Sequence, residues 1–290
     1  MPVISKKQSA TKPVRKAKSV SVIDRIAPIG FDDDEGISIL LYGRSGTGKT
    51  TLWSTFPKPI LSIIRSGGKR PGETRSIATA ANKKTIHTVA IESSQEVLEL
   101  VEMQEKTNKY KTIVVDHLSG LQDLILAEIL DLDHIPEQKA WGLAQQQDYG
   151  QCALQFKEIV RKVLDLSCNR VLIAQERDFS KGSDGPTTSG DMLFPFVAAA
   201  LMPSIVGWLN PAVDYIGNTF IRKKRVLKTK KLGGKEKKVW VNTGEVEFCL
   251  RTAPDDVFAT KFRVPKSKTP MPKEIVDPDH DKILSIIQGG

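Results

Sequence analysis

The sequence predicts an α/β fold with a mostly parallel central sheet flanked by helices. Short apolar and β-branched runs alternate along the chain with segments of helical apolar spacing, as in strands joined by helical crossovers. A glycine-rich loop lies directly between one such run and the helix after it. Right-handed crossovers bring the loops after parallel strands to one edge of the sheet. We therefore expect the functional site at that edge.

The expected strands are apolar runs bounded by turn signals. They occupy residues 37–42, 59–64, 85–91, 112–116 and 170–174. The intervening helical segments are 51–56, 94–106, 119–132 and 145–166. Residues 192–209 are predicted to be apolar helical stretches broken by two prolines, and the chain is β-rich from Tyr215 onward. Gly233 and Gly234 mark the turn of a C-terminal β-hairpin.

Changes in composition along the chain predict three segments. Residues 1–33 are rich in Lys, Ser, Ala and Pro and are expected to form a basic, disordered N-terminal arm. Residues 34–265 contain the predicted strands and helices, including a basic hairpin at 222–240. Residues 266–290 are rich in Pro, Lys and Asp, so we expect a loose C-terminal tail.

The overall composition is that of a globular protein. Of the 290 residues 40% are apolar and 27% are charged, which excludes wholesale disorder. No apolar run approaches the roughly 20 residues of a membrane span, and the N-terminus lacks the apolar core of a secretory signal. The three cysteines form no paired framework and no zinc motif. We therefore expect a cytoplasmic protein with reduced thiols and no membrane association.

The net charge of +9 is concentrated in two segments. Residues 1–18 carry six cations and no acid, and residues 222–238 carry ten cations and one acid. The remainder of the chain therefore has a net charge of −6. A mildly acidic body with two basic appendages favours a polyanionic partner. Solvated basic segments that only improve solubility are the alternative.

Residues 43–50 match the phosphate-binding pattern GxxxxGK[ST] at every fixed position, with a predicted strand before them and a helix after them. Glycines let successive backbone N–H groups point at phosphate oxygens. Lys49 can then reach the β- and γ-phosphates, and the Thr50 hydroxyl can bind Mg²⁺. The expected nucleotide-binding residues are Gly43, Arg44, Ser45, Gly46, Thr47, Gly48, Lys49 and Thr50.

Asp116 ends the β-branched run 112–116, at the edge of the sheet where the phosphate loop is expected. A phosphate loop needs a partner carboxylate to hold Mg²⁺, so Asp116 is the predicted second metal residue beside Thr50. The alternative is that Asp116 only caps the helix that follows.

Three stretches together resemble the core of RecA-like ATPases: residues 43–50, the strand 112–116 with the five residues after it, and residues 171–177. Over residues 36–265 the chain is more closely similar to the short phage-encoded RecA-like ATP-binding proteins, which are single-strand annealing recombinases. The resemblance implies a RecA-like P-loop NTPase core that binds ATP and Mg²⁺. It also implies slow, DNA-stimulated ATP hydrolysis and a role in DNA recombination by single-strand annealing or strand pairing.

The resemblance implies partners and a place of action as well. Single-stranded DNA is the expected ligand, and a single-strand DNA-binding protein is a further expected partner. Such proteins assemble head to tail into a ring or a filament with nucleotide at the subunit interfaces. A phage protein of this kind acts in the cytoplasm of the bacterial host.

The resemblance gives roles to residues near the end of strand 170–174. Gln175 matches a glutamine that senses the γ-phosphate and moves a DNA-binding loop; an ordinary polar strand end is the alternative. The Gly/Ser/Thr-rich stretch 178–191 matches the position of that loop, and Lys181 would be its main cationic contact.

Lys261 and Arg263 match a pair of cations that reaches the neighbouring subunit's nucleotide in RecA-like ring ATPases. Alternation along a strand puts both side chains on one face, so both could meet the same phosphates. Two solvated cations on an edge strand are the alternative.

The chain departs from the family at the glutamate that polarises the attacking water. RecA-like ATPases carry it just after the strand that follows the P-loop helix, whereas here residues 65–68 are Arg-Ser-Gly-Gly. Glu73 and Glu92 are the two candidates for a replacement. Nucleotide binding is therefore better supported than rapid hydrolysis.

The basic hairpin is the predicted DNA-binding surface, because its cations could neutralise several phosphates with little sequence preference. A DNA-translocating helicase or packaging-type ATPase, and a nucleotide-dependent scaffold with little hydrolysis, are the alternative functions. The predicted DNA-binding residues are Lys181, Arg222, Lys223, Lys224, Arg225, Lys228, Lys230, Lys231, Lys235, Lys237 and Lys238.

Overall fold

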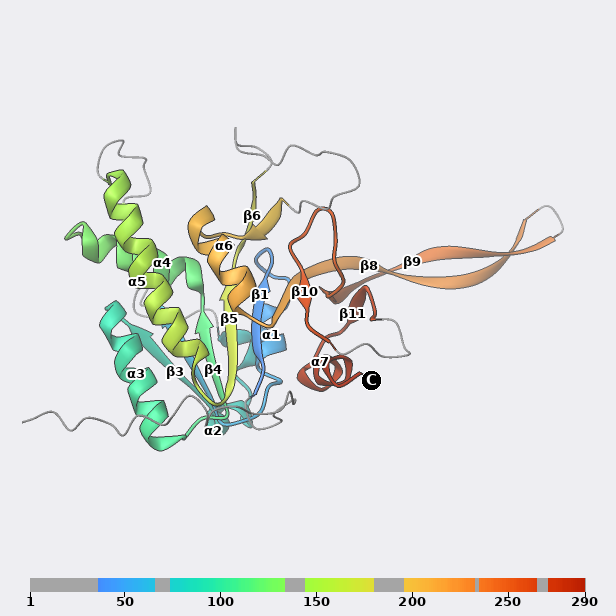
Figure 1. Cartoon of the computed structure of the whole chain (residues 1–290). Coiled ribbons are helices and arrows are strands. Elements are labelled where there is room, and N and C mark those ends of the chain that lie inside the picture. Colours follow the sequence, from blue (N-terminus) through green and yellow to red (C-terminus); the bar gives the residue numbers. More distant parts are fainter. Residues whose placement is uncertain are drawn as a thin grey trace, which may run out of the picture. The chain divides into compact units, whose positions relative to one another are not determined.

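A mixed sheet lies at the centre of the computed structural model, which describes residues 36–65, 74–133, 144–179, 196–232, 235–264 and 271–289 (Figure 1). Within these ranges the sheet has nine strands in the order β11-β9-β8-β1-β5-β4-β2-β3, with β10 paired to β8. The pairings from β3 through β2, β4, β5 and β1 to the start of β8 are all parallel. The predicted α/β fold with a mostly parallel sheet is therefore confirmed.

Five short parallel strands form the core of the sheet. Alternate residues of each strand face opposite sides, so Leu40 joins one apolar cluster while Ile39 and Leu41 join the other. Both faces are apolar because helices cover both of them. The strands are β1 (Ser38–Tyr42), β2 (Ile60–Arg65), β3 (Ile86–Ile91), β4 (Thr112–Asp116) and β5 (Asn169–Ala174).

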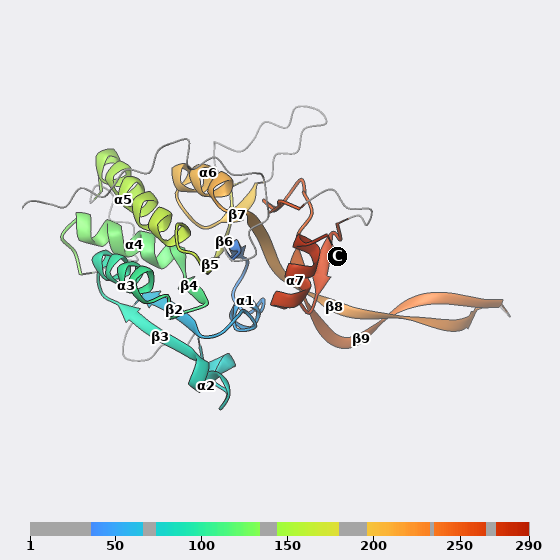
Figure 2. The same cartoon turned by 60° about the horizontal axis from the view of Figure 1, so that its bottom comes forward.

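Helices pack on the two faces of this sheet (Figures 1 and 2). One face is covered by α3 (Ser94–Thr107), α4 (Leu118–Ile129), α5 (Gln146–Leu164) and α6 (Pro203–Ala212). The other is covered by α1 (Lys49–Trp53) and α7 (His280–Ile287). Smaller elements are a 3₁₀ turn (Arg75–Ile77), α2 (Asn82–Thr85), and the two-stranded sheet of β6 (Glu176–Asp178) and β7 (Val197–Ala199).

The C-terminal segment is not the loose tail that the composition of residues 266–290 suggested. In the described part, residues 271–289, β11 (Glu274–Val276) pairs with β9, and α7 buries Ile283 and Ile287 completely in the core. The prediction was wrong because a Pro- and Asp-rich stretch hides a short amphipathic helix. Its apolar residues are four apart, and its cap Asp279 accepts a hydrogen bond from the Lys282 N–H.

The helical prediction for residues 192–209 was also wrong in part. Val197–Ala199 is the buried strand β7, paired antiparallel with β6, and the helix begins only at Pro203. Proline is well placed there because its missing N–H has no partner in the first helical turn. Residues 192–195 lie outside the described ranges, as do the predicted N-terminal arm 1–33 and most of the stretch 178–191.

The predicted C-terminal β-hairpin is present as β8 (Tyr215–Leu232) and β9 (Lys235–Arg251). The first residues of β8 pair with β1, from Ile39↔Tyr215 to Tyr42↔Asn218, and β10 (Lys261–Phe262) pairs with the same end. Beyond Ile221, in the described residues, β8 pairs with β9 alone and forms a long two-stranded ribbon (Figures 1 and 2). The predicted turn at Gly233 and Gly234 lies outside the described residues.

Candidate functional site

The glycine-rich loop joins the end of β1 to α1 at the carboxyl edge of the parallel strands. Gly46 and Gly48 have φ angles of 80° and 88°, a left-handed conformation that residues with a Cβ rarely adopt. At Gly43 the limit is space, because a Cβ there would lie 2.3 Å from the Thr219 carbonyl oxygen. The loop conformation therefore depends on these three glycines.

Lys49 is folded into this loop. Its side chain is buried, and its Nζ donates to the carbonyl oxygens of Gly43 at 2.7 Å and Arg44 at 2.8 Å. Burial lowers the pKa of Lys49, while the nearby charges of Asp116 and Glu176 raise it. A cation held inside a loop of backbone N–H groups is suited to bind an anion such as a phosphate.

Asp116 ends β4 and is buried beside α1. Its Oδ2 accepts a hydrogen bond from the Trp53 indole N–H at 3.2 Å. Burial raises the pKa of Asp116, and the Trp53 hydrogen bond and the charges of His117 and Lys49 oppose that rise. His117, not Asp116, caps α4, since its Nδ1 accepts from the Gly120 N–H at 2.9 Å. The capping alternative for Asp116 is therefore wrong.

These residues fit the nucleotide and the metal that the sequence implies. Trp53 lies one helical turn after Thr50, and it brings α1 into contact with the Asp116 carboxylate. A hydroxyl and a buried carboxylate are oxygen ligands of the kind that Mg²⁺ prefers. Thr50 and Asp116 would hold the metal ion, and Lys49 with the loop backbone would hold the phosphates.

Glu176 is a site residue that the sequence analysis missed. It begins β6 directly after Gln175, and its Oε1 accepts from the Arg44 Nε at 2.7 Å. Its side chain is only 17% exposed, and Asn218 Nδ2 donates to its other oxygen at 3.5 Å. The sequence carried no sufficient signal for it, because its place beside the loop depends on the pairing of β5 with β1.

Gln175 lies at the same edge of the sheet, because Ala174 pairs with Tyr42 immediately before the loop. Its carbonyl oxygen accepts a hydrogen bond from the Ala200 N–H at 2.7 Å, and its side chain is half-buried. The structure thus places the predicted sensor residue beside the loop. Lys181, its expected DNA-contacting neighbour, lies outside the described residues.

The first residues of the hairpin contact the glycine-rich loop directly. The Thr47 and Thr219 hydroxyls are 2.7 Å apart and share a hydrogen bond. On the other strand, Phe248 lies against the loop, since a Cβ on Gly48 would come within 3.0 Å of its ring. These contacts come from β8 and β9, so both strands of the hairpin touch the predicted nucleotide site.

Lys261 and Arg263 are not brought to the loop of their own chain. Lys261 Nζ donates to the Asn210 carbonyl oxygen at 2.6 Å, and Arg263 pairs with Asp214 at 2.8 Å. Both cations therefore lie at the C-terminal end of α6. Glu92 is not at the loop either. It follows β3, four strand spacings of about 4.8 Å from β1, and Glu73 lies outside the described residues.

The hairpin cations differ in their partners. Arg222 pairs with Glu247 at 2.9 Å and with Glu274, and Lys224 pairs with Glu245 at 2.9 Å. Acids on β9 and β11 therefore neutralise part of the charge that the sequence analysis assigned to DNA. Four further hairpin cations have described side chains and no acidic partner among the described residues: Lys223, Arg225, Lys228 and Lys238. The side chains of Lys230, Lys231, Lys235 and Lys237 lie outside the described part, although their backbone belongs to the two strands.

Two further structural observations concern the helices and the cysteines. In the ranges that the structure describes, no helix is both long enough and apolar enough to cross a bilayer. The three cysteines are buried and unpaired, and burial raises the pKa of the Cys152 and Cys168 thiols to about 11. These thiols are therefore poor nucleophiles.

Comparisons with known proteins point to a family. A family described as an AAA domain matches residues 35–263, a range that contains the loop, Asp116, Gln175 and the hairpin. No curated protein matches the chain. Among solved structures, a KaiC-like protein from the hyperthermophilic archaeon Pyrococcus horikoshii OT3 is similar with a TM-score of 0.38 and 13% identity, over 74% of this chain and 85% of that one.

Proposed function

Since this chain belongs to the AAA domain family of P-loop ATPases, we propose that it is a RecA-like, ATP- and Mg²⁺-dependent protein that binds single-stranded DNA. Its role would be DNA recombination by single-strand annealing or strand pairing. The observation that carries the proposal is the contact between the phosphate loop and the basic hairpin, through Thr47 with Thr219 and Gly48 with Phe248. A nucleotide-binding loop in contact with a cationic ribbon is suited to control how that ribbon binds a polyanion.

The nucleotide end of the site combines residues of opposite charge. Lys49 and the loop N–H groups bind the phosphates, and phosphate oxygens replace the two carbonyl oxygens that Lys49 now contacts. Thr50 and Asp116 hold Mg²⁺, which when bound neutralises charge on the phosphate oxygens. The raised pKa of Asp116 reflects a buried carboxylate that a cation would stabilise.

For hydrolysis, Glu176 replaces the glutamate that the sequence lacks after β2. It lies at the carboxyl edge of the sheet, bonded to Arg44 of the loop itself. A carboxylate in this position can orient and deprotonate the attacking water once Arg44 turns to the phosphates. Gln175, the residue before it, would report the state of the γ-phosphate.

Assembly completes the proposed function. The subunits form a ring or filament, and Lys261 or Arg263 acts on the neighbouring subunit's nucleotide after leaving its present partners at the end of α6. The partners are single-stranded DNA and a single-strand DNA-binding protein. The place of action is the cytoplasm of a bacterium infected by the phage that encodes the protein.

The test measures ATP binding, oligo(dT) binding and ATP hydrolysis with and without oligo(dT), for the full chain and for Lys49→Ala. We expect ATP to tighten oligo(dT) binding, oligo(dT) to stimulate hydrolysis, and Lys49→Ala to lose ATP binding on the order of 100-fold. Absence of oligo(dT) binding at low salt would overturn the proposal. DNA binding that changes neither with ATP nor with Lys49→Ala would favour the alternative of a scaffold with little hydrolysis. Strand separation on a forked duplex would favour the alternative of a helicase.

A further inference from the structure

An exposed tryptophan lies on the ribbon, apart from the residues that bind nucleotide. Trp240 is 65% exposed and pairs across the ribbon with Leu227, which is 48% exposed. Tryptophan is usually largely buried, and it is enriched where proteins contact ligands. Trp240 belongs to neither apolar core cluster, so packing of the core does not explain why a tryptophan stands there. A binding role would explain it.

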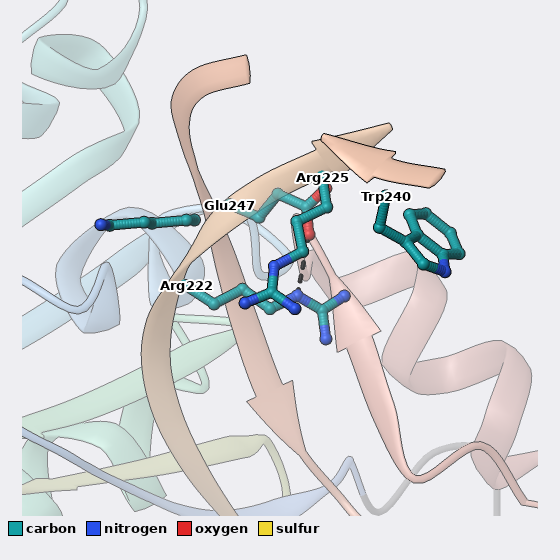
Figure 3. Close-up of a pocket in the computed structure, with 5 residues that line it drawn as sticks. Arg222, Arg225, Trp240 and Glu247 are labelled. Atoms are coloured by element: carbon teal, nitrogen blue, oxygen red, sulfur yellow. Dashed lines mark hydrogen bonds and ion pairs between the residues drawn. The ribbon is translucent and has the colours of Figure 1, made fainter. Parts of the chain in front are cut away.

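An irregularity in the ribbon brings two arginines to the same place. Arg222 and Arg225 are three residues apart, so regular alternation would put them on opposite faces. The register of β8 on β9 shifts between Lys223 and Arg225, as at a β-bulge, and such a shift redirects side chains. Both arginines line one hollow of about 640 Å³ together with Trp240 and Glu247 (Figure 3).

The two arginines are not equivalent. Arg222 is held by Glu247 and Glu274, and the dashed line in Figure 3 marks the first of these pairs. Arg225 has no acidic partner among the described residues, and neither does Lys223 at the rim of the hollow. The hollow thus combines an exposed indole with two cations that no described acid neutralises.

We propose that this hollow binds one nucleotide unit of single-stranded DNA, with the base stacked on Trp240 and the adjoining phosphate bound by Arg225. The site rests on the proposed function, in which single-stranded DNA is the ligand. Aromatic stacking beside cations is the chemistry by which proteins hold single strands without sequence preference. The net positive charge around the indole selects this polyanion over a second copy of the ribbon, which carries the same charge.

The experiment compares Trp240→Ala, Trp240→Phe and Arg225→Gln in the full chain with Leu154→Ala as the control. Leu154 is an exposed apolar residue on α5, 70% exposed, far along the sequence from the ribbon. Oligo(dT) affinity is measured against salt, together with ATP affinity, intrinsic tryptophan fluorescence and the molar mass in solution. Trp240→Ala should weaken oligo(dT) binding about tenfold with an unchanged salt slope. Trp240→Phe should retain most of the affinity but lose the quenching of fluorescence by oligo(dT).

Arg225→Gln should weaken binding and reduce the salt slope by about 0.7, the value for one phosphate of a single strand. ATP affinity should stay unchanged in all variants. Wild-type oligo(dT) affinity in Trp240→Ala would overturn the stacking site while leaving the proposed function intact. A changed molar mass with wild-type affinity per subunit would overturn it in favour of a subunit interface. No oligo(dT) binding by the wild-type chain would overturn the proposed function itself.

Discussion

At the carboxyl edge of the sheet Lys49 and Asp116 are 8% and 6% exposed, whereas on the ribbon Trp240 is 65% exposed. The base of the loop is held by close packing, including the close approach of Gly43 to Thr219, although its tip at residues 44–46 is exposed. The ribbon beyond Ile221 is fixed, in its described residues, by its own ladder and by a few ion pairs such as Arg222 with Glu247. The nucleotide end thus depends on single buried groups, and the ribbon depends on summed charge. A single substitution at the nucleotide site should therefore abolish nucleotide binding, whereas each substitution on the ribbon should weaken DNA binding by only a part.

The largest expected effect is on DNA binding, from replacing by glutamine the four ribbon cations that have no acidic partner in the described part of the chain. The variant is K223Q/R225Q/K228Q/K238Q, and the matched control is K83Q/K84Q/K109Q/K111Q, four exposed lysines of the body. Each lost phosphate contact lowers the salt slope by about 0.7, so the slope should fall by about 3 and low-salt affinity by on the order of 100-fold. Fluorescence anisotropy of labelled oligo(dT) measures both. An equal loss in the control would show that the charge of the whole chain matters instead of the ribbon.

The next effect should be confined to hydrolysis. Glu176→Gln keeps the shape of the side chain but removes the base, so steady-state ATP turnover should fall about 100-fold. ATP affinity, measured by equilibrium binding, should remain near wild type. Glu92→Gln is the control at the distant edge of the sheet and should keep full turnover. If Glu92→Gln and not Glu176→Gln stops hydrolysis, the assignment of the base is wrong.

A smaller effect is expected on communication between the two regions. Thr219→Val removes the hydroxyl that contacts Thr47, a bond worth about 1 kcal/mol, so the factor by which ATP tightens oligo(dT) binding should fall about fivefold. Thr243→Val makes the same change on β9, where the hydroxyl donates to the Lys224 carbonyl oxygen and accepts from the Glu245 N–H, and it should leave that factor unchanged. If ATP tightens oligo(dT) binding by the same factor in wild type and in Thr219→Val, the Thr47–Thr219 hydrogen bond does not couple the two sites.

The smallest effect concerns stability and pH. Burial raises the pKa of Asp116. Between the ordinary aspartate pKa and this raised value the folded chain binds more protons than the unfolded chain, so the free energy of unfolding falls as pH rises through that window. Above the window the carboxylate is charged and buried. A buried charge lowers the free energy of unfolding, and Asp116→Asn removes that charge. The thermal midpoint of Asp116→Asn without nucleotide at pH 7 should therefore exceed that of wild type. Asp133→Asn, at an exposed site, should not change it, and a lower midpoint for Asp116→Asn would contradict the sign.

The sequence was sufficient for features that depend on neighbouring residues. The parallel strands follow from local spacing and are confirmed. The loop at 43–50 and Asp116 lie at the expected edge of the sheet, and their roles stay predictions. Glu176 and Thr219 were missed because their importance depends on which strands flank β1, and a sequence does not give the order of strands. The ion pairs of Arg222 depend on residues 25 and 52 positions away. Composition alone also hid α7, whose burial depends on contact with the distant α1 face.

The ribbon also sets a length. From Ile221 to Leu232 β8 spans roughly 35–40 Å at about 3.3 Å per residue, and over this span its described pairing is to β9 alone. Removing two residues from each strand in register would therefore shorten the ribbon without altering a residue of the sheet core. The length of the ribbon can thus change without a change in the residues of the nucleotide site. Chains with the same phosphate loop could differ in how far from the sheet they engage a strand.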